Sequence, residues 1–75
     1  MKIYRIKIDD LFYVKGIIFD SEGIQIIPTW KIEEAGWYEE EKAKKYCEEL
    51  NKKKDTQEAN IKFSLEFVKE VENER

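Results

Sequence analysis

The stretch IKFSLEF, residues 61–67, decides the fold, because its pattern fits two different elements. Apolar and polar residues alternate at all seven positions, which is the period of a half-buried strand. Phe63, Phe67 and Val71 also follow the i, i+4, i+8 spacing of one helix face. The unbroken alternation favours a strand within residues 59–71, and a second helix is the alternative.

The clearest helix lies just before this stretch, over residues 38–52 (YEEEKAKKYCEELNK). Its apolar residues recur at i, i+3, i+4 and i+7 and form one stripe: Ala43, Tyr46, Cys47 and Leu50. Glutamates at 39–41 and lysines at 52–54 complement the helix dipole at its two ends. The segment is therefore predicted to pack on a sheet through this stripe.

Three more strands are predicted before the helix, over residues 2–9, 11–19 and 24–30. The first alternates strictly, and the second is rich in aromatic and β-branched residues. Pro28 has no N–H for a ladder, so the third is an edge strand or a strand end. The order β-β-β-α-β predicts an α+β fold, a small antiparallel sheet with one main helix on one face. A helical ending would instead give a β-meander with two helices.

The second predicted strand is apolar on both faces, which bears on what covers the sheet. Strict alternation places Phe12, Val14 and Ile18 on one face and Tyr13, Ile17 and Phe19 on the other. Gly16 inside this run predicts a bulge or a close backbone approach. One helix covers one face only, so we expect something else to cover part of the other, and a homodimer is the simplest candidate.

The composition limits the class of protein. The chain has 75 residues, of which 41% are apolar and 41% charged, with a net charge of −3. This length fits a single domain over residues 1–75, with no deep cavity expected. The sequence shows no membrane-spanning run and no apolar signal-peptide core near Met1, and Cys47 is its only cysteine. We expect a cytoplasmic protein without disulfides.

The sequence offers few groups for catalysis. It contains no histidine, which removes the commonest general base and zinc ligand. Neither phosphate-binding glycine motif is present. Cys47 falls on the apolar helix stripe, where a cysteine acts as a small hydrophobe. We therefore expect no enzyme, no cofactor and no metal.

A nucleic-acid or nucleotide site is the alternative function on the open sheet face. Arg5, Lys7 and Lys15 are expected on that face with Tyr13, and basic groups beside an aromatic ring suit a single strand. Against this, the chain is acidic and has only two arginines. Direct nucleic-acid binding is therefore the less favoured hypothesis.

The stretch WKIEEAGWYEEE, residues 30–41, is the most distinctive in the chain. As a binding patch, its aromatic residues would anchor a partner and its glutamates would attract a basic protein surface. The candidate contact residues are Trp30, Glu33, Glu34, Trp37, Tyr38, Glu40 and Glu41. In the structural alternative, the tryptophans cover the sheet and residues 39–41 only complement the helix dipole.

The order of these segments, with a high Lys-to-Arg ratio and ten isoleucines, resembles many small uncharacterised proteins encoded by phages and mobile elements. Some proteins of this type inhibit host defence, the anti-CRISPR proteins among them, and they commonly bind an effector. The resemblance implies a non-enzymatic inhibitor that binds a host defence protein through the acidic and aromatic face. The alternatives are the nucleic-acid or nucleotide binder and a purely structural, dimerising subunit.

Overall fold

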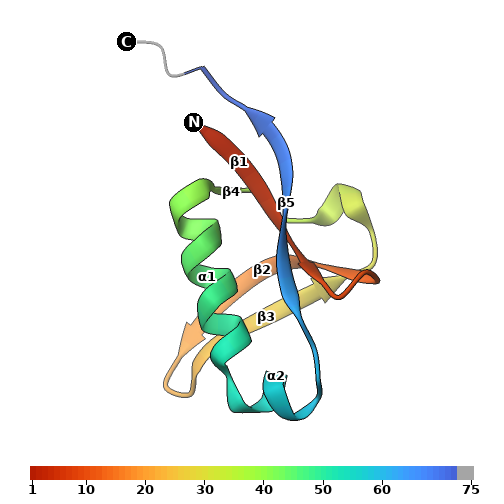
Figure 1. The fold of residues 1–75 in the computed structure, drawn as a ribbon, viewed down its shortest axis with the longest axis vertical. Coiled ribbons are helices and arrows are strands. Elements are labelled where there is room, and N and C mark those ends of the chain that lie inside the picture. Colours follow the sequence, from red (N-terminus) through yellow and green to blue (C-terminus); the bar gives the residue numbers. More distant parts are fainter. Residues whose placement is uncertain (73–75) are drawn as a thin grey trace.

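A computed structural model describes residues 1–72 of the chain. Its sheet contains the strands β1 (Lys2–Ile8), β2 (Phe12–Asp20), β3 (Gly23–Thr29), β4 (Tyr38–Glu39) and β5 (Phe63–Glu70). The helical elements are the 3-10 turn η1 (Ile32–Glu34), α1 (Glu40–Lys52) and α2 (Lys54–Glu58). Figure 1 shows β1 and β5 running side by side, the β2–β3 hairpin crossing below them, and α1 beside both. The predicted α+β fold is confirmed.

Strand β1 is the centre of the sheet. It pairs antiparallel with β5 from Lys2 to Ile8, which occupies one of its two backbone edges. The other edge is shared, because β2 pairs near Ile8 and β4 pairs near Ile3. The strand prediction within residues 59–71 is thus confirmed, and β4 is a fifth strand that the sequence pattern did not predict.

A bulge in β2 changes which of its side chains face the core. Val14 pairs with Pro28 and Gly16 with Ile27, so Lys15 has no partner on β3. The bulge predicted from Gly16 is present. The extra residue shifts the alternation by one position.

The predicted face assignment for β2 was wrong as a result. Val14 is buried and Ile17 packs against the same core, while Ile18 is 47% exposed. Phe19 also turns towards the helix, where its ring lies 5.7 Å from that of Tyr46.

The core lies between the sheet and α1. Its buried residues are Ile6, Ile8, Val14, Ile24, Leu50 and Phe63. From the predicted stripe of α1, Ala43 and Leu50 are buried, and Tyr46 and Cys47 are half-buried. The helix begins at Glu40 rather than residue 38, because Tyr38 and Glu39 pair with β1.

Asn51, in the last turn of α1, binds the backbone at the start of β5. Its Nδ2 donates to the carbonyl oxygen of Phe63 at 2.9 Å, and its Oδ1 accepts the Phe63 N–H at 2.9 Å. Cys47 Sγ also donates to that carbonyl, at 3.2 Å. Phe63 is only 8% exposed, so these bonds satisfy polar groups that water hardly reaches.

We therefore expect Asn51→Ala to lower the free energy of unfolding by about 1–3 kcal/mol, the usual cost of a buried group left without a partner. Urea denaturation measures it. Lys45→Ala, at an exposed position of α1, is the control and should change stability by less than about 0.5 kcal/mol. Equal losses of unfolding free energy in the two variants would contradict the role of Asn51 in holding α1 to the start of β5.

Candidate binding surface

The two tryptophans of residues 30–41 are exposed. Trp30 is 72% exposed and Trp37 is 55% exposed. Neither tryptophan is among the buried or partly buried residues of the core. Trp37 contacts Lys69 on β5, so the structural alternative, in which the tryptophans cover the sheet, is met in part at Trp37. Large aromatic surface left in water is typical of a contact site.

Trp30 belongs to a turn with a defined shape. Thr29 is 7% exposed and accepts the Lys31 N–H at its Oγ1 (3.1 Å). The same hydroxyl donates to Glu34 Oε1 at 2.8 Å. After η1, the Gly36 N–H donates to the Val14 carbonyl at 2.9 Å, which returns the chain to the sheet.

All residues from Trp30 to Glu34 are exposed. We call three of them, Trp30, Ile32 and Glu33, the Trp30 turn. Ile32 is 46% exposed, and sequence reasoning missed it because the 3-10 turn that begins at this residue was not predicted. Lys31 Nζ lies 5.7 Å from the centroid of the Trp30 ring, which adds a cation–π contact within the turn.

Tyr38, another predicted contact residue, packs against the core. Tyr38 is half-buried, and its ring meets that of Tyr46 edge to face at 5.7 Å between centroids. Burial, and to a lesser degree Tyr46, raises the pKa of Tyr38. Tyr38 is therefore part of the core packing rather than of an exposed patch.

The glutamates do not form one continuous acidic face. Figure 1 places η1, with Glu33 and Glu34, well apart from the start of α1, with Glu40 and Glu41. Glu40 accepts a hydrogen bond from the Tyr4 hydroxyl at 3.3 Å and forms an ion pair with Lys44 at 3.6 Å. Within residues 1–72, Glu33 and Glu41 form no ion pair.

Trp37 lies against β5. Lys69 Nζ is 4.6 Å from the centroid of its ring, a cation–π contact that fixes one side of the indole. Lys69 was not among the predicted residues, because the β5 register that brings it to Ile3 cannot be read from the local sequence. Trp37 thus presents a ring that is held in place and still more than half exposed.

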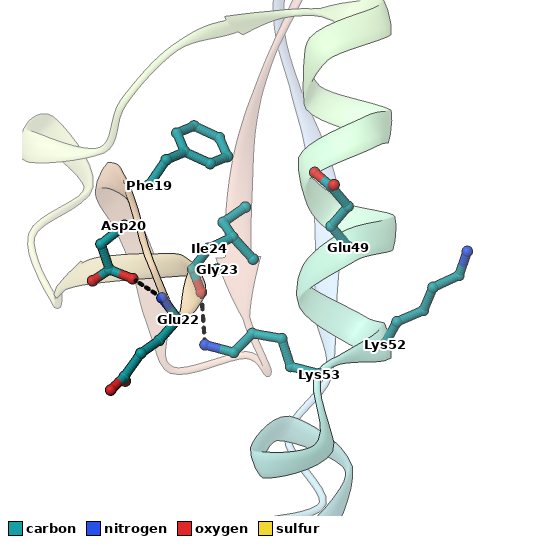
Figure 2. Close-up of a pocket in the computed structure, with 8 residues that line it drawn as sticks. All are labelled: Phe19, Asp20, Glu22, Gly23, Ile24, Glu49, Lys52 and Lys53. Carbon is teal, nitrogen blue, oxygen red and sulfur yellow. Dashed lines mark hydrogen bonds between the residues drawn. The ribbon is translucent and has the colours of Figure 1, made fainter.

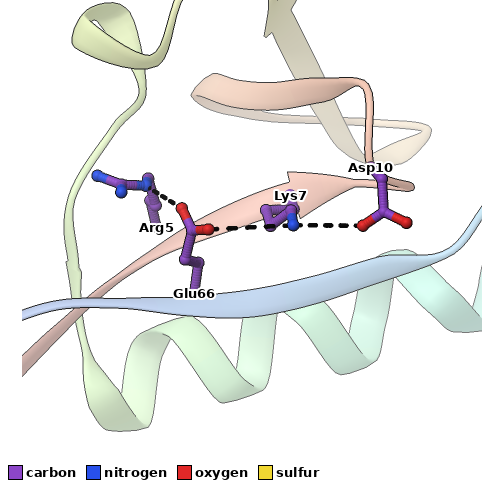
Figure 3. Close-up of polar contacts among 4 residues, drawn as sticks. All are labelled: Arg5, Lys7, Asp10 and Glu66. Atoms are coloured by element: carbon purple, nitrogen blue, oxygen red, sulfur yellow. Dashed lines mark hydrogen bonds and ion pairs between the residues drawn. The ribbon is translucent and has the colours of Figure 1, made fainter.

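The predicted basic face is assembled, but acids balance its charge. Arg5 lies over the Tyr13 ring, 5.8 Å from its centroid. Figure 3 shows Glu66 between Arg5 and Lys7: it pairs with the Arg5 guanidinium and lies 4.0 Å from Lys7 Nζ. Lys7 also pairs with Asp10 at 3.3 Å.

Lys15 is tied in the same way, by an ion pair with Glu34 at 4.0 Å. All three basic groups that would meet phosphates therefore already face carboxylates. This charge balance disfavours a nucleic-acid site on this face.

A shallow pocket of about 390 Å³ lies between the β2–β3 hairpin and the end of α1 (Figure 2). The Asp20 and Lys53 side chains in its lining bind backbone groups of the hairpin. The Glu22 N–H donates to Asp20 Oδ1 at 2.8 Å, and Lys53 Nζ donates to the Ile24 carbonyl at 2.6 Å. The pocket places no nucleophile and base together.

Cys47 is placed for packing. Burial raises the pKa of its thiol, and the Asn51 side chain opposes that shift. A raised pKa keeps the sulfur protonated and unreactive near neutral pH.

Comparison with known proteins found no matching family model, no matching curated protein and no matching solved structure. Among residues 1–72, no three metal-ligating side chains gather at one point. None of the helices in this part of the chain is long and apolar enough to cross a membrane. The geometry of the exposed side chains is therefore the main basis for a functional proposal.

The Thr29 hydroxyl, more than the nearby charges of Lys15 and Lys31, lowers the pKa of Glu34. We expect Thr29→Val to raise this pKa towards the ordinary glutamate value and Thr29→Ser to keep it low. Because the folded-state pKa is depressed, its stabilising effect is present at neutral pH and is lost as the pH falls through that value. A carboxyl-detected NMR titration measures the pKa, and an unchanged value in Thr29→Val would contradict this cause.

Glu66→Gln should remove the carboxylate that pairs with Arg5 and faces Lys7, and so raise affinity for a mixed oligonucleotide pool several-fold over wild type, with a steep salt dependence. Fluorescence anisotropy measures this affinity. The control is Glu70→Gln, which makes the same charge change on β5, four residues further along. Strong binding by wild type, with no gain in Glu66→Gln, would show that the ion pairs do not block the face.

Proposed function

We propose that this protein is a non-enzymatic, cytoplasmic binding protein that docks on a basic surface of another protein through the Trp30 turn. The observation that carries the proposal is that Trp30, Ile32 and Glu33 are exposed on a turn whose backbone is held by the Thr29 hydroxyl. A turn that is ordered before binding loses less entropy when it docks, and an exposed tryptophan buries a large area.

A basic partner is favoured by the charges that remain free. Glu33, within the Trp30 turn, is exposed and forms no ion pair within residues 1–72. Glu41, at the distant start of α1, is also exposed and forms no ion pair in this part of the chain, and the whole chain carries a net charge of −3. The Glu33 carboxylate in the same turn as the aromatic anchor, together with this net charge, favours a basic surface.

A non-enzymatic role is supported by the groups available for chemistry. The chain has no histidine, and its one cysteine is hydrogen-bonded to Phe63 with a raised pKa. We further propose that the partner is a host defence protein whose basic surface normally binds nucleic acid. The resemblance to small phage-encoded proteins supports this class of partner.

The test is capture of partners from a bacterial lysate, followed by affinity measurement with the purified partner. We expect Trp30→Ala to weaken binding by more than about tenfold, as removal of an anchor residue does. Glu33→Lys should weaken binding more at low salt than at high salt, because salt screens surface charges.

Two matched controls keep this test specific. Leu11→Ala removes a side chain that is also 72% exposed, and Glu58→Lys makes the same charge reversal on α2. Neither should change affinity. A partner that binds Trp30→Ala and Glu33→Lys as well as wild type, or the absence of any partner at either salt concentration, would refute the proposal.

A further inference from the structure

Strand β3 lies at an edge of the sheet with little protection. Within residues 1–72 its only strand partner is β2. Its sequence, GIQIIPT, contains no charged residue. Edge strands usually carry charges or proline that prevent pairing with another chain. Within β3 the only such residue is Pro28, and from outside the strand Lys53 reaches the Ile24 carbonyl.

The hydrogen-bonding groups on its outer edge can be identified. Lys53 Nζ donates to the Ile24 carbonyl at 2.6 Å, as the dashed line in Figure 2 shows, so this carbonyl points away from β2. The N–H and C=O groups of one residue face the same edge, and the direction alternates along the strand. Ile24, Ile26 and Pro28 therefore point their backbone groups outward.

The hydrogen-bonding groups on the outer edge of β3 are self-complementary around Ile26. When two β3 strands meet antiparallel with Ile26 opposite Ile26, these two residues exchange two hydrogen bonds. On each side, the Ile24 N–H reaches the carbonyl of the partner's Pro28. Pro28 has no N–H to return to the Ile24 carbonyl, but Lys53 already satisfies that group.

We propose that a second copy of this chain pairs with β3 in this register, joining the two sheets into one across a two-fold axis. Every outward backbone group from Ile24 to Pro28 then has a partner. An unrelated extended peptide would lack the proline that matches the carbonyl bound by Lys53, so the pattern favours a second copy.

The surroundings of the edge fit a neighbouring strand. A groove of about 310 Å³ runs beside Gln25 and Ile26, with Leu50 and Phe63 in its lining. On the other face of the sheet, Ile27 is 43% exposed and would lie beside the partner's Gln25. Pairing would remove this apolar surface from water without bringing like charges together.

The first measurement is sedimentation equilibrium of the unaltered chain over a wide concentration range, with amide exchange followed by NMR. We expect the mass to rise from one chain towards two. The Ile24 and Ile26 amides should become protected as the dimer forms. A monomer at every concentration, or a dimer in which these amides still exchange rapidly, would overturn the proposal.

A pair of matched variants tests the register. Ile27→Lys places two lysines next to the two-fold axis and should weaken dimerisation by at least about tenfold. Ile18→Lys makes the same change on the same face of β2, at a similarly exposed position, and should leave dimerisation intact. Equal effects of both variants would exclude pairing through β3.

The dimer does not depend on the proposed function. The Trp30 turn follows the end of β3 at Thr29 and contributes none of the paired backbone groups. Trp30→Ala should therefore leave dimerisation unchanged, and Ile27→Lys should leave the surface of the Trp30 turn intact.

Discussion

The backbone of β1 is the constraint on which the rest of the structure depends, because both of its edges are used. One edge is filled by β5, and the other is divided between β2 and β4. This division fixes where the chain must return after the hairpin. The segment between β3 and β4 has to lead from the outer strand β3 past β2 and back to the β1 edge. On the way its Gly36 N–H bonds the Val14 carbonyl of β2, and the two tryptophans lie at its ends, next to β3 and β4.

The local sequence pattern predicted those elements whose periodicity or composition is visible within their own residues. Alternation identified β1 and β5, aromatic and β-branched content identified β2, and the apolar stripe identified α1. The pattern could not predict β4, because two residues held only by pairing with β1 carry no period of their own. The faces of β2 were wrong for a similar reason. Gly16 signalled a bulge, but strict alternation was still applied across it.

The candidate site was only partly predictable. The composition of residues 30–41 pointed to Trp30, Trp37 and the glutamates, and both tryptophans are indeed exposed. Composition could not show that Tyr38 turns inward to Tyr46, or that Glu34 is held by the Thr29 hydroxyl. These contacts depend on how separate segments meet. Ile32 was missed because the 3-10 turn that exposes it was not predicted, and Lys69 because only the β5 register brings it to Trp37.

The bulge at Lys15 has a consequence for how this chain can change during evolution. Its one extra residue lets Val14 and Ile17 share the core face, whereas a regular strand would place these two residues on opposite faces. Lys15 is the residue that the bulge adds, so its loss would leave a regular ladder in which Val14 still pairs with Pro28 and Gly16 with Ile27. Ile17 would then keep its place on the Val14 face. Substitutions at the exposed Lys15 also leave the faces of the strand unchanged. Natural selection should therefore tolerate variation in both length and identity at this one position of β2.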